Sequence, residues 1–272
     1  MTRYLLLLKR IKEISVFLLL FFTISGEAQD LEVGPFCGGS YYLGDLNPGK
    51  HFLNTQLAYG ILVRYNIDTR WAVKLSGYRG TVKGNSTSTN FLTGRDLAFS
   101  SPVTDISAVV EFNFFPYFTG SYRNRITPYI YAGFSCFFFD PVSNGISLRS
   151  MGTEGQNIGY EGRQPYGGYS FSIPFGLGAK ISIARSLGLQ VFWEMHKTFT
   201  DYLDDASTTY YLDGPAIPVE DLEGNMSDPT RNHQPGMQRG NAKNMDWFAF
   251  FGVSVTYKFN LLSSKRCRDL NH

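Results

Sequence analysis

Eight stretches of alternating apolar and polar residues, joined by connections that are alternately long and short, constrain the fold of this chain most. Side chains of a β-strand alternate between its two faces, so the apolar set of each stretch faces lipid and the other set faces an interior. Short turns at one end and long loops at the other are typical of a barrel that spans a membrane. We therefore predict an all-β chain that forms a closed eight-stranded antiparallel transmembrane β-barrel, with short periplasmic turns and long surface loops.

The alternation defines the bounds of the predicted strands, and it is clearest in the last one, 247–259. The predicted strands are 31–42, 57–65, 71–81, 103–114, 126–138, 169–183, 186–196 and 247–259. The predicted periplasmic turns are 66–70, 115–125 and 184–185. The predicted surface loops are 43–56, 82–102, 140–168 and 197–246, which are rich in Gly, Asn, Asp, Ser and Thr. Aromatic girdles are expected at both boundaries of the membrane. The lower, periplasmic girdle contains Tyr65, Trp71, Phe114, Tyr257 and Phe259, and the upper girdle contains Tyr42 and Trp247.

The N-terminus predicts export. Basic residues between positions 9 and 12 precede an apolar run that ends at Gly26-Glu27-Ala28, which is typical of a cleaved signal peptide. We expect a signal peptide over residues 1–28, a barrel over 29–259 and a basic tail over 260–272. An even number of strands then places both ends of the mature chain in the periplasm, with the barrel in a bacterial outer membrane.

Charge and cysteine content limit the function classes. The formal net charge is only +2, and no cluster of Lys and Arg is combined with stacking aromatic residues, so nucleic-acid binding is excluded. Cys37, Cys136 and Cys267 have no metal-ligand spacing. We expect Cys37 and Cys136 to act as small apolar residues on strands that are not neighbours. Cys267 is either a free thiol or pairs with another chain.

The alternation also predicts what fills the barrel. Four acids and four bases face inward, with His196 near the top: Glu32, Asp105, Glu111 and Glu194 against Arg64, Lys74, Lys180 and Lys258. Unpaired charges in so narrow a space are costly, so a balanced set predicts an interior charge network and no open channel. The alternative is that the balance arises by accident from the chosen strand registers.

Three groups of residues are candidates for a site of chemistry. The acidic loop 197–246 has carboxylates that favour Ca²⁺, but its spacing does not match an EF-hand, and acidic loops are ordinarily solvated. His196, Asp201 and nearby serines are the residue types of a hydrolytic triad. No nucleophile elbow is present in the sequence, so we do not expect them to act as one. Gly176 and Gly178 are inward strand positions that relieve crowding. We expect no catalytic residue, no cofactor and no bound metal.

Four segments carry a resemblance to a known family. They are Glu32-Val33-Gly34 through Tyr41-Tyr42-Leu43-Gly44-Asp45-Leu46, Thr127-Pro128-Tyr129 with Tyr131-Ala132-Gly133, Pro174-Phe175-Gly176-Leu177-Gly178, and His196 through Thr200-Asp201-Tyr202-Leu203-Asp204-Asp205. With these segments the chain resembles the PorG-like outer-membrane barrels of the Bacteroidota type IX secretion system.

The resemblance implies a non-catalytic membrane component that associates with a periplasmic ring of partner subunits. Such a ring reaches only the short turns and the chain ends, so Lys265, Arg266 and Arg268 of the basic tail are candidate partner contacts. Two other function classes stay open: a small surface-binding or membrane-stabilising barrel of the OmpA or OmpX type, and an outer-membrane enzyme that acts on lipid. In every case outer-membrane lipid surrounds the barrel.

Overall fold

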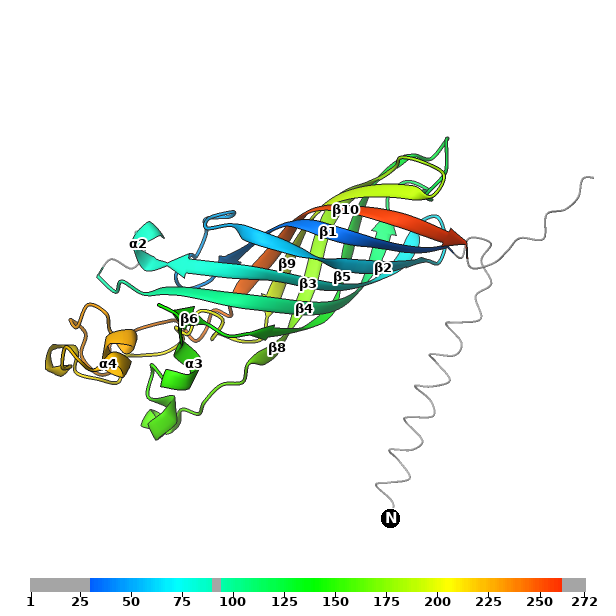
Figure 1. Ribbon diagram of the computed structural model, residues 1–272. Helices are drawn as coiled ribbons and strands as arrows, with labels where there is room; N and C mark the ends of the chain where they lie inside the picture. Colours follow the sequence, from blue (N-terminus) through cyan, green and yellow to red (C-terminus); the bar gives the residue numbers. More distant parts are fainter. Residues whose placement is uncertain (1–29, 90–93, 261–272) are drawn as a thin grey trace, which may run out of the picture.

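The chain folds into a closed antiparallel β-barrel (Figure 1). The computed structural model describes residues 30–89 and 94–260. The barrel strands are β1 (Asp30–Leu43), β2 (Gln56–Asn66), β3 (Trp71–Asn85), β4 (Ala98–Asn113), β5 (Ile126–Phe139), β8 (Tyr169–Ser182), β9 (Leu187–Thr198) and β10 (Trp247–Asn260). They follow the order β3-β2-β1-β10-β9-β8-β5-β4, and pairing of β3 with β4 closes the ring. The predicted eight-stranded barrel is confirmed.

The closed ring forces every strand to have an inside and an outside. Along β3, inward residues are buried, whereas outward residues are exposed or half-buried. Large apolar side chains dominate the outside, such as Leu75, Ile106 and Phe134, which are 55%, 60% and 75% exposed. An apolar surface of this extent requires lipid around it. Cys37 and Cys136 both lie on this outer face, and both are free thiols.

The hairpin of β3 and β4 is longer than predicted. Its ladder continues from Thr81↔Pro102 to Asn85↔Ala98, over residues such as Gly84 and Ser100 that show no apolar alternation. Backbone hydrogen bonds maintain a ladder above the lipid, where outward side chains need not be apolar. A two-residue pair, β6 (Val142–Ser143) and β7 (Ile146–Ser147), extends the sheet at the edge of β4.

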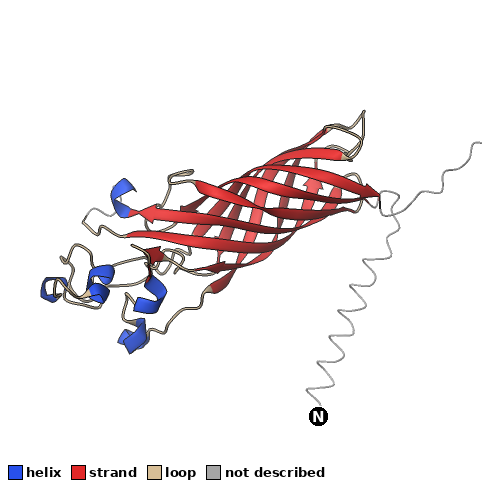
Figure 2. Ribbon diagram, in the orientation of Figure 1, coloured by secondary structure: helices blue, strands red, loops and turns tan. Residues whose placement is uncertain are grey.

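The loops at one end of the barrel carry all the short helices of the described residues (Figure 2). They are α2 (Ser86–Thr89), α3 (Leu148–Met151), η1 (Gln156–Ile158), η2 (Tyr160–Gly162), η3 (Gly214–Ala216) and α4 (Leu222–Ser227). None of the helices in the described part of the chain is long and apolar enough to span a bilayer.

Tyr42 corrects one predicted girdle position. Its side chain is fully buried at the mouth of the barrel, because even-numbered positions of β1 point inward, as Glu32 does. The outward neighbour Tyr41 is also buried, since the loop after β1 folds back over it and places Phe52 against its ring. The predicted signal peptide 1–28, Cys267, and the tail residues Lys265, Arg266 and Arg268 lie outside the described residues.

Candidate functional site

The half of the barrel interior nearer the short turns, here called the lower half, holds a chain of ion pairs centred on Arg64. Its guanidinium donates to Glu32 at 2.8 Å and to Glu111 at 2.7 Å. Lys180 donates to the same Glu111 at 2.6 Å. All four side chains are buried. They point into the lumen from β1, β2, β4 and β8, of which only β1 and β2 are paired neighbours, so these contacts cross the interior of the barrel. Each charge therefore has an opposite charge within hydrogen-bond reach, as burial in a narrow lumen requires.

The upper half of the interior is organised around Glu194. Lys74 donates to this carboxylate at 3.0 Å, and Nε2 of His196 lies 3.1 Å from its other oxygen. Asp105 lies 3.6 Å from Nδ1 of His196, and within the described residues its carboxylate oxygens have no hydrogen-bond partner. The His196 ring stacks on Phe248 with a centroid distance of 4.2 Å.

Lys258 occupies a different position from the rest of the predicted set. It lies at the lower edge of the barrel and pairs at 3.4 Å with Asp30, a residue that the interior prediction did not include. Both side chains are partly exposed, because each is close to the end of its strand. This pair closes the barrel rim and is separate from the interior ion pairs.

Two glycines make room for the aromatic rings that seal the lumen. Tyr129 and Tyr131 stack with centroids 5.5 Å apart, and the ammonium groups of Lys180 and Lys74 lie 4.4 Å from them. Opposite these rings on β8 are the inward glycines, and a Cβ at Gly176 would come within 2.6 Å of the Tyr131 hydroxyl. The rings and the charged groups of the ion pairs are in contact across the interior, and their side chains are almost fully buried.

The residues around His196 have the composition of a hydrolytic triad. Oγ of Ser172 lies 3.0 Å from Nδ1 of His196, whose Nε2 faces Glu194. All three side chains have no exposed surface, so a substrate has no path to the hydroxyl. Asp201, the predicted acidic partner, lies in the last long loop. The arrangement contributes to the interior charge network.

The long loops that follow β5 and β9 pack together at the loop end of the barrel and form a unit that is here called the cap. A second buried network of charged residues holds the cap together. Arg239 is buried and donates to Glu154 at 3.2 Å and to Asp205 at 3.4 Å. Glu154 also accepts the backbone N–H groups of Ser207 and Thr208, at 2.9 and 3.0 Å. Burial opposes the charge of Arg239, but the two carboxylates raise its pKa. Neither Arg239 nor Glu154 was predicted, because no sequence spacing connects two loops that are 85 positions apart.

The cap is attached to the barrel mouth by Tyr42. Its hydroxyl contacts the carboxyl of Asp204 and lies 3.0 Å from that of Asp246. A tyrosine hydroxyl has one proton, so it donates to only one of these carboxyls. The other carboxyl must carry a proton of its own and donate it to the tyrosine oxygen. The geometry therefore requires one neutral carboxylic acid in this group.

Burial explains how such a proton is held. Desolvation raises the pKa of Asp204 to about 8, and it raises that of Asp201 to about 9, with the neighbouring carboxyls adding to the Asp201 shift. Asp246 is raised in the same direction. The described part of the chain has no group of three His, Cys, Asp or Glu side chains arranged to hold a metal ion. The raised pKa values allow these clustered acids to be buried without charge.

One family model and several solved structures are similar to this chain. A family model described as a domain of unknown function, DUF6089, matches residues 11–210. The chain belongs to the DUF6089 family. The match covers β1 to β9 and ends within the loop that forms the cap. A search among curated proteins finds none that matches this DUF6089 chain.

Three bacterial proteins are among the similar solved structures. OprG from Pseudomonas aeruginosa has 11% identity and a TM-score of 0.45, covering 87% of this chain and 99% of that chain. Neisserial surface protein A has 10% identity and a TM-score of 0.43, covering 84% and 97%. Ail of Yersinia pestis has 10% identity and a TM-score of 0.41, covering 85% and 99%. Because these TM-scores are below 0.5, the fold rests on the strand pairing described above.

Proposed function

We propose that this chain is a non-catalytic, non-conducting barrel of the bacterial outer membrane that presents an ordered cap outside the cell, like small barrels of the OmpA or OmpX type. The observation that carries the proposal is the filled interior. Arg64, Glu111 and Lys180 cross the lumen below, and Lys74 and Glu194 cross it above, each within ion-pair distance. A water-filled path for solutes requires these pairs to separate, which is costly in a narrow lumen.

The ordered loops of the cap support a function in binding at the cell surface. An unstructured set of loops needs no buried arginine, whereas Arg239 fixes three segments of chain through Glu154, Asp205 and the carbonyl of Ser227. Residues on the outside of the cap, such as Val219, are exposed. Fixed surface loops on a rigid barrel are the usual location of binding residues.

Conductance and surface labelling test this proposal. Purified protein in planar lipid bilayers is expected to give no ion-conducting steps, and sustained open steps would contradict a closed lumen. In a background without native cysteines, Val219→Cys in the cap should react with a membrane-impermeant maleimide on intact cells. Arg70→Cys in a short turn should react only after the outer membrane is opened, and the reverse pattern would refute the orientation.

A second candidate is a component of a type IX secretion machine, anchored to a periplasmic ring. It is favoured by the resemblance, and two of the resembling segments, 41–46 and 200–205, meet in space through Tyr42 and Asp204. In this candidate the short turns and the tail residues Lys265, Arg266 and Arg268 contact the periplasmic partners.

The two candidates differ in what they bind in the periplasm. Crosslinking mass spectrometry on intact envelopes should recover ring subunits attached to turns 66–70 or 115–125, or to the tail. Deletion of residues 260–272 with normal barrel insertion should then reduce both subunit recovery and secretion. Normal secretion in a strain that lacks the whole chain would eliminate this candidate and leave the surface-binding barrel.

A further inference from the structure

The outward-facing charges of the barrel are all of one sign. Among the described residues of the eight barrel strands, the outward positions carry three charged side chains, Arg79, Lys83 and Lys197, and all are cations near the loop end. The acids of these strands face inward. Register places Lys197 beside Trp247, and its ammonium lies 5.7 Å from that ring. This position is the upper edge of the apolar surface, where lipid head groups begin.

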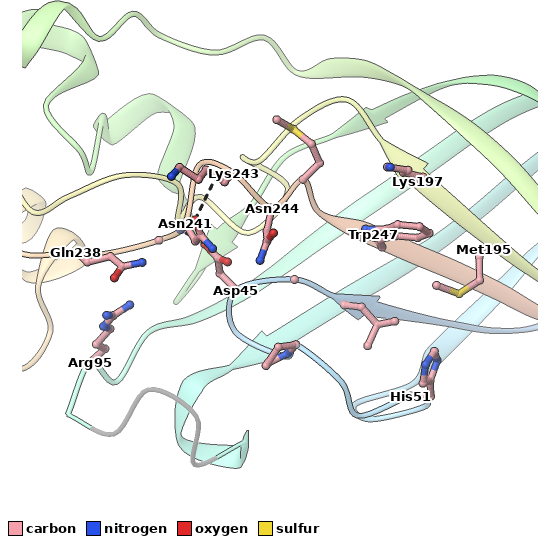
Figure 3. Close-up of a pocket in the computed structure, with 15 residues that line it drawn as sticks. Asp45, His51, Arg95, Met195, Lys197, Gln238, Asn241, Lys243, Asn244 and Trp247 are labelled. Atoms are coloured by element: carbon pink, nitrogen blue, oxygen red, sulfur yellow. Dashed lines mark hydrogen bonds between the residues drawn. The ribbon is translucent and has the colours of Figure 1, made fainter.

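A pocket of about 820 Å³ opens at this edge (Figure 3). Its floor is the outer face of the barrel, with Met195 and Trp247 from β9 and β10. Its upper wall comes from the loops, with Arg95 from the hairpin of β3 and β4 and Lys243 from the segment before β10. Lys197 lies at the barrel end of the pocket and Asp45 lies between the two groups.

The pocket has more positive charge than its own acid can neutralise. Within the described residues, Arg95, Lys197 and Lys243 have no carboxylate oxygen in ion-pair distance, although the cap and lumen cations do. Asp45, the acid that lines the pocket, accepts the backbone N–H of Asn241. One guanidinium nitrogen of Arg95 donates to the carbonyl of Arg239 at 2.8 Å, which fixes its position and leaves other N–H groups available.

We propose that this pocket binds the phosphorylated head group of an outer-leaflet lipid, whose acyl chains lie along β9 and β10. The inference rests on the outer-membrane placement proposed above. Phosphate matches the donors, since Arg and Lys are the side chains that recognise it by charge and hydrogen bond. Below the pocket, Val191 and Val253 are outward and 49% and 42% exposed, so they offer an apolar surface to acyl chains.

A lipid fits this pocket better than a soluble anion does. The floor of the pocket continues into the lipid-facing surface of the barrel, because Met195, Trp247 and Phe251 belong to one apolar cluster on the outer face. A soluble phosphate would leave that apolar floor in water. A lipid covers the floor with its chains and brings phosphate to the cations at the same time.

The test uses purified full-length protein in detergent and native mass spectrometry, with synthetic diphosphoryl lipid A as the probe. The variant Arg95→Gln/Lys197→Gln/Lys243→Gln is expected to retain lipid at least about tenfold less than the unchanged protein. Its matched control is Arg123→Gln/Arg125→Gln/Arg185→Gln, which removes three exposed cations at the opposite end. The control is expected to bind as the unchanged protein does.

Other outcomes overturn the inference. Equal loss in both triple variants would indicate attraction by overall charge, and full displacement of the lipid by inorganic pyrophosphate would indicate a soluble anion. Lys243→Gln alone changes one exposed loop residue and gives a readout if the triple variant fails to fold. Binding is measured on isolated protein, so its failure is distinct from failure of the membrane placement, which the maleimide labelling measures.

Discussion

The hydroxyl of Tyr42, near the end of β1, bonds to the carboxyl of Asp204, which lies 162 positions later in the chain. The same hydroxyl meets Asp246, and the other carboxylate oxygen of Asp246 accepts the N–H of Leu203 at 3.0 Å. One side chain of the first strand therefore holds both ends of the last long loop. Loss of this contact should loosen the cap and leave the barrel intact.

Tyr42→Phe tests this attachment by removing only the hydroxyl. The two carboxyls lose their shared partner, which is expected to weaken the cap by about 1–3 kcal/mol. Faster deuterium exchange over residues 200–210 would measure this effect. Tyr210→Phe is the matched control, because Tyr210 is also buried in the cap but its hydroxyl has no partner within the described residues. Equal exchange in the two variants would contradict the role of Tyr42.

The stability of the cap should depend on pH through its neutral acids. In the folded protein the pKa values of Asp204 and Asp201 rise from 3.8 to about 8 and about 9. The folded form therefore holds more protons than the unfolded form between these values, and its stability falls as pH rises through that window. The stabilisation is complete below pH 3.8 and is lost as pH passes about 8 to 9.

A spin label at Val219→Cys, in protein without its native cysteines, reports this change directly. Its electron paramagnetic resonance spectrum should become more mobile between pH 6 and pH 10. Asp201→Asn cannot ionise at this position, so it should reduce the change. A spectrum that stays constant over this range would disprove the assignment of buried neutral acids.

Alternation of side chains predicts the barrel and the side of most strand residues, with Tyr42 as an exception because it points inward and not to the outer girdle. In a closed sheet surrounded by lipid, alternate apolar residues such as Trp247, Ala249 and Phe251 must face outward. The sequence pattern therefore determines which face of the strand meets the lipid. The alternation also puts Arg64 and Glu111 inside. It did not predict which acid meets which base, since that depends on strand stagger, and Lys258 meets Asp30 instead of the interior acids.

The cap was beyond prediction for a physical reason. Loop residues have no period, and the partners of Arg239 are 34 and 85 positions away in other segments. The acidic composition of 197–246 favoured a solvated loop, yet Asp204, Asp205 and Asp246 are buried. Tertiary packing around one arginine and one tyrosine decides their positions, and neither leaves a local signal.

Gly176→Ala is expected to destabilise the barrel by about 1–3 kcal/mol, because the added methyl group overlaps the backbone carbonyl oxygen of Trp193 and the Tyr131 side chain. The unfolding free energy in urea with detergent micelles measures this change. Gly77→Ala is the matched control: it is also a strand glycine, but a Cβ there meets nothing within 4 Å. If both variants are equally stable, the lumen is less filled than the contacts indicate.

Arg64→Gln is expected to have the largest effect of these substitutions. It leaves Glu32 without its ionic partner and Glu111 with Lys180 alone, inside a region where both carboxylates are buried. Breaking a buried pair in this way typically costs about 3–5 kcal/mol, whereas Arg123→Gln, at an exposed turn, should cost almost nothing. Urea unfolding in micelles gives both values. The double variant Arg64→Gln/Glu32→Gln should recover part of the loss, because it removes one of the unpaired charges. If the double variant is instead less stable than Arg64→Gln alone, repulsion from the unpaired Glu32 carboxylate is not the source of the loss.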